Sequence, residues 1–185
     1  MFQSVKISEQ QIPRMRYRCP SCTETHEGFP ALAYSLPDPI FHLTPEEREA
    51  RTVVSTDLCI LDDARYFIRC VLSVPVEGYV EDFEYGPWVE VGADDFSRYS
   101  VWFNLGVSPG WQSVKGRIAN AFPEMEQTTL GLECTVILPD DDDQRPFVQV
   151  HDIGHPLYDE QLNGMQLVRV TELVAHLKGF VLILG

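Results

Sequence analysis

Two cysteines and a histidine near the start of the chain form its most specific short motif. Cys19 and Cys22 are separated by two residues, and His26 follows four residues after Cys22. Two thiolates at this spacing suit one tetrahedral zinc ion, and the imidazole supplies a third ligand. A closed structural site needs a fourth ligand, which the fold would have to bring from Cys59, His42, His151 or His155. Two other interpretations stay open, namely a reduced thiol pair inside a tight turn and redox chemistry.

A second group of residues suited to metal binding or proton transfer lies in the sequence His151-Asp152-Ile153-Gly154-His155. Imidazoles titrate near neutral pH, and together with a carboxylate they suit a metal-dependent enzyme. Spacing alone does not establish such a site, because a loop that leaves a strand and caps the next helix has the same composition. The chain contains no serine nucleophile elbow, phosphate-binding glycine loop or His-Glu-x-x-His helix. The sequence therefore predicts no catalytic residue.

The densest negative charge lies between Glu77 and Asp95, where seven acidic residues occur without a base. The acids alternate with aromatic residues, a composition that suits capture of a basic protein surface. Opposite charges speed the encounter, and buried aromatic rings stabilise the complex. The alternative is that the acids keep the protein soluble and the rings belong to the core. The candidate partner-binding set is Glu81, Asp82, Glu84, Trp88, Asp94 and Asp95.

The elements that must position these residues are mainly strands. Alternating or apolar runs bounded by turn residues predict strands at 58–61, 66–76, 88–91, 113–118, 129–138 and 147–150. Capping residues and apolar faces predict helices at about 44–52, 94–106, 155–164 and 170–178. Consecutive strands with short links predict an α+β fold, in which an antiparallel, meander-like sheet of about six strands carries peripheral helices.

The chain is expected to form one domain, because 185 residues suffice for one hydrophobic core and are few for two. Residues 1–43 are expected to be an irregular segment that carries the Cys-x-x-Cys motif and packs on an α+β core of residues 44–185. Prolines at positions 13, 20, 30, 37 and 39 exclude a long helix there and interrupt any central strand. The apolar end, Phe180–Gly185, is expected to form an additional strand or part of an interface with another chain.

The charge of the whole chain limits its partners. The net charge is −14, and residues 56–185 carry 21 acids against eight bases. This charge repels phosphate backbones and anionic lipid headgroups, so we expect neither a nucleic-acid nor a membrane partner. No apolar run reaches about 20 residues, and the start lacks the apolar centre of a secretory signal. Because Cys59, Cys70 and Cys134 lie in runs typical of core thiols, a secreted disulfide framework is disfavoured and a soluble cytoplasmic protein is expected.

Short motifs spread over most of the chain occur here in combination. They are Tyr17, Cys19, Cys22, His26-Glu27-Gly28 and Pro30, then 57–60, 66–69, 74–76 and 88–91, and finally His155-Pro156-Leu157, Gln161 and Gly164. Together, over about residues 17–172, they resemble an uncharacterised bacterial family, the domain of unknown function numbered 2199. The resemblance implies a small, soluble bacterial protein and brings no established activity, so no catalytic residue follows from it. Its cysteine-containing opening favours the zinc interpretation of Cys19, Cys22 and His26.

The leading functional hypothesis is a non-catalytic protein-binding module. Small acidic bacterial proteins of this kind look like immunity proteins, which neutralise a toxin domain by covering its active cleft. A nuclease toxin fits best, because a cleft that holds nucleic acid is basic and an acidic inhibitor imitates that charge. The alternatives are a structural or regulatory module supported by zinc at Cys19, Cys22 and His26, and a metal-dependent enzyme that uses His151, Asp152 and His155.

Overall fold

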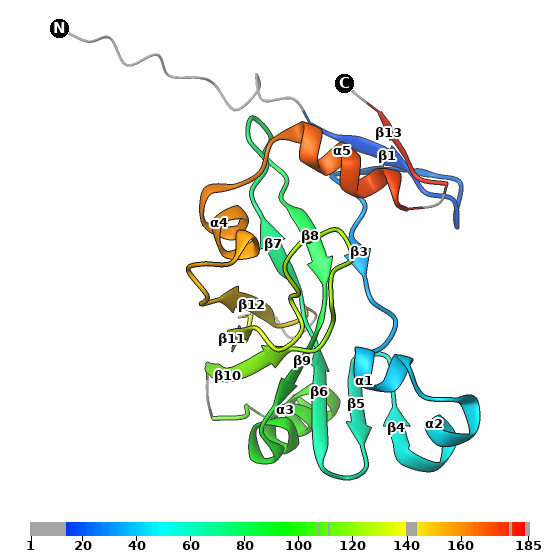
Figure 1. Ribbon diagram of the computed structural model, residues 1–185, viewed down its shortest axis with the longest axis vertical. Helices are drawn as coiled ribbons and strands as arrows, with labels where there is room; N and C mark the ends of the chain where they lie inside the picture. Colours follow the sequence, from blue (N-terminus) through cyan, green and yellow to red (C-terminus); the bar gives the residue numbers. More distant parts are fainter. Residues whose placement is uncertain (1–13, 107, 111, 140–143, 178, 184–185) are drawn as a thin grey trace, which may run out of the picture.

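The computed structural model describes residues 14–106, 108–110, 112–139, 144–177 and 179–183 (Figure 1). The strands in these ranges are β1 (Arg16–Arg18), β2 (Thr25–Glu27), β3 (Leu32–Ala33), β4 (Thr52–Val54), β5 (Leu58–Leu61), β6 (Arg65–Arg69), β7 (Leu72–Val74), β8 (Phe83–Gly86), β9 (Trp88–Val91), β10 (Ser113–Ile118), β11 (Glu133–Ile137), β12 (Phe147–Val150) and β13 (Val181–Ile183). The helices are α1 (Asp38–Phe41), α2 (Pro45–Arg51), α3 (Ala93–Leu105), α4 (Pro156–Asn163) and α5 (Leu167–Ala175). The expected α+β fold is confirmed, with more strands than the sequence indicated.

The main element is a seven-stranded sheet in the order β12-β11-β10-β9-β6-β5-β4, in which all neighbours pair antiparallel. The strand order follows the chain except between β6 and β9, so the sheet is the expected meander with one excursion. The excursion forms β7 and β8, which join β3 in a three-stranded sheet. A third sheet, β13-β1-β2, brings the last strand beside the first hairpin, and Figure 1 shows this sheet near α5.

Several segments differ from the sequence prediction, among them β4 (Thr52–Val54), which the sequence analysis did not predict. The run 66–76 is divided into β6 and β7, because the chain leaves the main sheet where the Val71 N–H donates to the Pro146 carbonyl (2.8 Å). The acidic and aromatic segment 83–86 is strand β8. Residues 14–43, expected to be irregular, contain three short strands and α1. Their prolines fall in the turns or at the start of α1, where a missing N–H costs no helix or ladder hydrogen bond.

The two faces of the seven-stranded sheet enter different cores. One face packs with α3, α4, α5 and the β7–β8 strands in the larger core. On the opposite face a smaller core lies under α1 and contains Ile40, Cys59, Leu61, Phe67, Trp88 and Ala119. This smaller core covers only the part of that face formed by β5, β6 and β9. The same face over β10, β11 and β12, which we call the outer face, carries polar side chains such as Lys115 and Gln149, both exposed.

The helix ends follow local sequence signals. In α2 the Glu47 N–H donates to the Thr44 hydroxyl (3.2 Å) and the Thr44 N–H donates to the Glu47 carboxylate (3.0 Å), which is a capping box. Helix α3 ends at Gly106, whose φ of 66° is the left-handed conformation that glycine adopts without strain. Within the described ranges, no helix combines the length and the apolar character needed to cross a membrane.

Candidate functional site

The Cys-x-x-Cys motif lies in the turn of the β1–β2 hairpin. Cys19 follows the last residue of β1, and His26 lies within β2. Two backbone hydrogen bonds close the turn, from the Thr23 N–H to the Cys19 carbonyl (2.9 Å) and from the Cys19 N–H to the Glu24 carbonyl (3.0 Å). Thr23 adopts a positive φ of 62°, which reverses the chain within a few residues. The turn therefore brings Cys22 back toward His26.

Three metal-ligating side chains converge in this hairpin. The ligand atoms of Cys19, Cys22 and His26 lie within 4.8 Å of one another, and Cys22 Sγ is 3.0 Å from His26 Nε2. Hydrogen bonds from the backbone N–H groups of Cys22 and Ser21 lower the pKa of the Cys19 thiol, which favours the thiolate form that binds metal. Among the described residues, this is the one group of three or more Cys, His, Asp or Glu side chains with such spacing. It is a candidate metal centre with three protein ligands.

The residues considered as a fourth ligand lie elsewhere. Cys59 is buried in the smaller core, and His155 is buried at the start of α4. His42 ends α1, and His151 follows β12. Within the part of the chain that the structure describes, none of the four joins the cluster. Among the described residues, the candidate metal centre therefore has three protein ligands, Cys19, Cys22 and His26, and no fourth.

The C-terminal strand supports the hairpin from its other edge. Strand β13 pairs with β1, so the apolar tail provides an additional strand over Val181–Ile183, whereas residues 184–185 lie outside the described ranges. The Tyr17 ring stacks on His26, with 5.2 Å between ring centroids, and also contacts Phe180 at 5.8 Å. The His26 ring is thus held by Tyr17 of β1, which in turn packs against Phe180 of the C-terminal segment.

An acidic pocket lies directly beside this hairpin. Its volume is about 430 Å³, and the residues that line it are Glu27, Gly28, Phe29, Ser73, Val80, Glu81, Asp82 and Glu84. Glu27 is the last residue of β2, and a Cβ added to Gly28 would lie 3.7 Å from Glu81 Cγ, so the hairpin and the β7–β8 turn are in contact. The structure thus brings together three members of the candidate partner-binding set, Glu81, Asp82 and Glu84.

The acids of this pocket lie in an unfavourable electrostatic environment. Partial desolvation raises the pKa of the Asp82 carboxyl, and partial desolvation followed by the charge of Asp82 raises the pKa of Glu84. Glu81 Oε2 is buried and accepts no hydrogen bond from the described residues. Glu27 alone has a cation beside it, Arg14 at 3.4 Å, in a pair with both side chains exposed. The pocket therefore carries negative charge at Glu81, Asp82 and Glu84 that no ion pair among the described residues neutralises.

The other three members of the set do not join this pocket. Trp88, expected to contact the partner, is fully buried, and its indole N–H donates to the Tyr34 carbonyl (3.0 Å). That expectation is wrong because β9 is covered on both faces, so the Trp88 ring belongs to the smaller core. Asp94 and Asp95 lie in the first turn of α3, at the opposite end of the molecule from the β7–β8 turn (Figure 1).

The three residues considered for a metal-dependent enzyme have separate partners. The His151 ring contacts the Thr135 hydroxyl (2.6 Å), and Asp152 accepts from the Gly154 N–H (3.1 Å). His155 is buried, and its Nδ1 accepts from the Leu157 N–H (3.1 Å) as the N-cap of α4. Each side chain is thus occupied by a loop, strand or helix-capping contact, and they form no metal cluster among the described residues.

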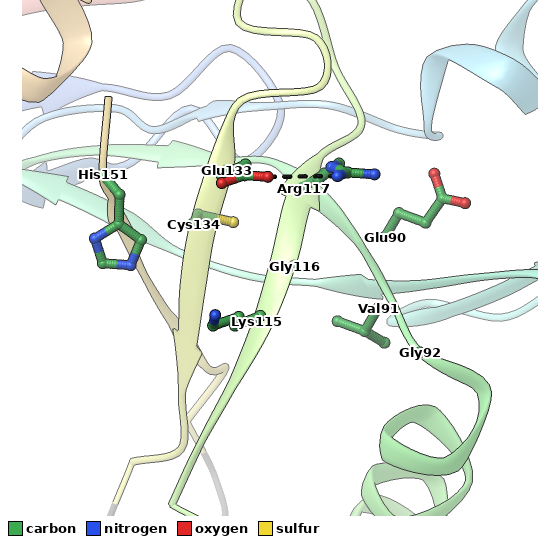
Figure 2. Close-up of a pocket in the computed structure, with 9 residues that line it drawn as sticks. All are labelled: Glu90, Val91, Gly92, Lys115, Gly116, Arg117, Glu133, Cys134 and His151. Carbon is green, nitrogen blue, oxygen red and sulfur yellow. Dashed lines mark hydrogen bonds and ion pairs between the residues drawn. The ribbon is translucent and has the colours of Figure 1, made fainter. Parts of the chain in front are cut away.

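A second pocket, of about 580 Å³, opens on the outer face of the sheet. Its residues are Glu90, Val91, Gly92, Lys115, Gly116, Arg117, Glu133, Cys134 and His151 (Figure 2). Lys115 and Arg117 extend from β10, and His151 lies beyond β11. The side chains of Val91 and Cys134 are buried in the larger core, so their backbone forms the base of this pocket. Charged side chains from alternate strand positions surround that base.

Sequence reasoning missed Glu27, Lys115 and Arg117. Glu27 belongs to the acidic pocket through a contact between segments more than fifty residues apart, for which the sequence contains no local signal. Lys115 and Arg117 did have a signal, because the alternation from Ser113 to Ile118 places both bases on one face of a strand. The same alternation that predicts the strand also places Lys115 and Arg117 together on its outer side.

Comparison with protein-family models identifies a family for most of the chain. A family model described as "Uncharacterized protein conserved in bacteria (DUF2199)" covers residues 18–165 and therefore includes the Cys/His cluster, the acidic pocket from Glu27 onward and the outer-face pocket. No curated protein and no solved structure matches the chain.

Proposed function

The chain belongs to the bacterial family of uncharacterised proteins DUF2199, and on that premise we propose that it is a non-catalytic module that binds a basic protein through its acidic pocket. The observation that carries the proposal is the pocket itself, where Glu81, Asp82 and Glu84 have no ion pair among the described residues. Partly desolvated carboxylates without a cation gain most from a partner that supplies one. Phe29, buried against Phe83, and exposed Val80 give the pocket apolar surface.

The class of partner that fits this charge best is a nuclease-type toxin domain, with this chain as its immunity protein. A nuclease cleft is basic because it holds a phosphate backbone, and an acidic inhibitor occupies the same field. The net charge of −14 extends the attraction beyond the pocket and speeds association. Reduced cysteines and a toxin target in the cell both fit a cytoplasmic location.

Zinc is the metal that suits the Cys19, Cys22 and His26 cluster, because two thiolates and an imidazole are borderline-soft ligands that prefer a tetrahedral ion. The sheet of β13, β1 and β2 has short strands, so metal binding would supply stability that its small apolar contacts do not. The hairpin carries Glu27 into the acidic pocket, so a zinc ion here would act as a structural support for the binding surface.

Charge reversal tests the binding proposal. The probe is the protein encoded next to this chain in its genome, purified in an inactive form, and the measurement is surface plasmon resonance at several salt concentrations. The triple variant Glu81→Lys, Asp82→Lys and Glu84→Lys should weaken binding at least about a hundredfold and flatten its salt dependence. The matched control reverses three exposed acids outside the pocket, Glu46, Glu49 and Glu126. Equal weakening by both triples would reject the pocket as the binding surface.

Elemental analysis of the purified protein tests the metal. We expect about one zinc per chain, lost in the Cys19→Ser and Cys22→Ser variants. The control is His42→Ala, an exposed histidine outside the cluster, which should retain the metal. Hydrogen exchange over residues 14–27 should accelerate when zinc is removed, while β9 and β10 remain protected. Protein purified without zinc, with the hairpin equally protected, would reject the support role.

A further inference from the structure

The outer face of the sheet gathers three basic side chains in one pocket of a strongly acidic molecule. Its pocket is lined by Lys115, Arg117 and His151, whereas the chain as a whole has twice as many acids as bases. Lys115 takes part in none of the ion pairs of the described residues. Local cations in a concave site attract small anions even on a protein of the opposite net charge, because nearby charges dominate the field there.

The two carboxylates of this pocket are already paired with arginines. Glu90 accepts two hydrogen bonds from Arg65, at 2.8 and 2.6 Å, so this acid adds little free negative charge. The Arg117–Glu133 pair is longer, 3.4 Å, and both side chains are exposed. Exposed pairs of this kind contribute little to stability, so Arg117 can exchange Glu133 for a ligand with a stronger charge.

Hydrogen-bonding side chains line this pocket on β10 and just after β12. Lys115 of β10 lies directly opposite Thr135 of β11, and the Thr135 hydroxyl contacts the His151 ring after β12 at 2.6 Å. In Figure 2, Arg117 extends from the same strand as Lys115. A phosphate group carries more negative charge and more acceptor oxygens than a carboxylate, so it gains more from several basic side chains in one pocket.

We propose that the outer-face pocket binds a small molecule through a phosphate group, held by Lys115, Arg117 and His151, whose ring is oriented by the Thr135 hydroxyl. A volume of about 580 Å³ is within the range of sites for small ligands. The base of the pocket is sheet backbone, which leaves room for the rest of the molecule above β10 and β11. This site is separate from the acidic pocket and does not depend on its function.

Isothermal titration calorimetry of the full chain at low salt tests the site. The probes are inorganic phosphate, pyrophosphate and glucose 6-phosphate, with succinate as the planar carboxylate. We expect saturable binding of the phosphates that Lys115→Gln and Arg117→Gln each weaken at least about tenfold. The matched control is Arg98→Gln, which removes an exposed arginine of α3 that has no ion pair among the described residues and should leave binding unchanged.

Tighter binding of glucose 6-phosphate than of inorganic phosphate identifies an organic phosphate as the ligand class, and the reverse order identifies the free ion. Histidine ring signals should shift on titration in the wild type and not in the His151→Gln variant. Absence of saturable binding up to about 10 mM, succinate binding as tightly as phosphate, or equal weakening by Arg98→Gln would overturn the proposal.

Discussion

The carboxylates of the seven-stranded sheet and those of the acidic pocket have opposite surroundings. In the sheet, Glu90 accepts two hydrogen bonds from Arg65, and in the turn between β5 and β6 Asp62 accepts two from Arg51 at 2.8 and 2.7 Å. The Arg51 guanidinium lowers the pKa of Asp62. In the pocket, desolvation raises the pKa values of Asp82 and of its neighbour Glu84. The first region has acids that stabilise the fold, and the second has acids whose charge opposes it.

This difference separates scaffold from binding surface in a chain whose net charge is −14. The net charge of the whole chain does not distinguish the two regions. They differ in whether an arginine lies beside each acid. A charge that is unfavourable in the free protein becomes favourable when a partner brings a cation, because the same desolvation then strengthens the attraction. The comparison therefore predicts different responses to neutralising single acids.

The largest effect is expected at Trp88, which the sequence analysis assigned to the partner-binding set and which lies in the smaller core. Trp88→Ala removes a fully buried ring together with the hydrogen bond from its indole N–H to the Tyr34 carbonyl. The free energy of unfolding should fall by about 3–5 kcal/mol, measured by urea denaturation. Val80→Ala, at an exposed position of the pocket, is the control and should cost little. A small loss of stability combined with loss of partner binding would show that Trp88 contributes to the binding surface and not to the core.

Glu90→Gln tests the paired acids of the sheet. The substitution keeps the shape of the side chain and removes its charge, so the bidentate contact with Arg65 is weakened. Because both side chains are partly exposed, the expected loss is about 1 kcal/mol in the free energy of unfolding. Thermal or urea unfolding at neutral pH measures it. An increase in stability would show that the arginine pairs do not support the sheet.

Glu84→Gln should have the opposite sign. The raised pKa means that the folded protein disfavours the charged form, so neutral glutamine should increase the free energy of unfolding at pH 7, by less than about 1 kcal/mol given its solvent access. As the pH falls through the raised pKa the wild-type carboxyl takes up its proton, and the difference between variant and wild type should shrink. Glu126→Gln is the exposed control. A decrease in stability at pH 7 would remove the distinction between the two regions.

The features that sequence could predict depend on local signals. The capping box at Thr44, the glycine end of α3 and the convergence of Cys19 with His26 all arise within a few residues, and the structure contains each of them. The error at Trp88 has a long-range cause, since α1 covers the second face of β9 and no nearby residue indicates this. The meeting of Glu27 with the β7–β8 turn is equally non-local. The composition is sufficient to identify the acidic segment. Distinguishing its exposed carboxylates from its buried aromatic rings requires the fold.

The smallest effect is expected at Asp62, in the turn between β5 and β6. Asp62 and Asp63 both have positive φ, 54° and 52°, a conformation that asparagine also adopts readily, so Asp62→Asn removes the charge while retaining the turn. The lowered pKa of Asp62 means that its pairing with Arg51 stabilises the fold above the ordinary value of 3.8 and ceases to do so as the pH falls through the lower folded value. Wild type should therefore exceed the variant in melting temperature at neutral pH and low salt, and the two should converge in acid or in high salt, because the pair is exposed. A difference that persists in acid would mean that the turn, and not the charge, is what Asp62 contributes, and the contrast with Glu84 would then rest on conformation instead of electrostatics.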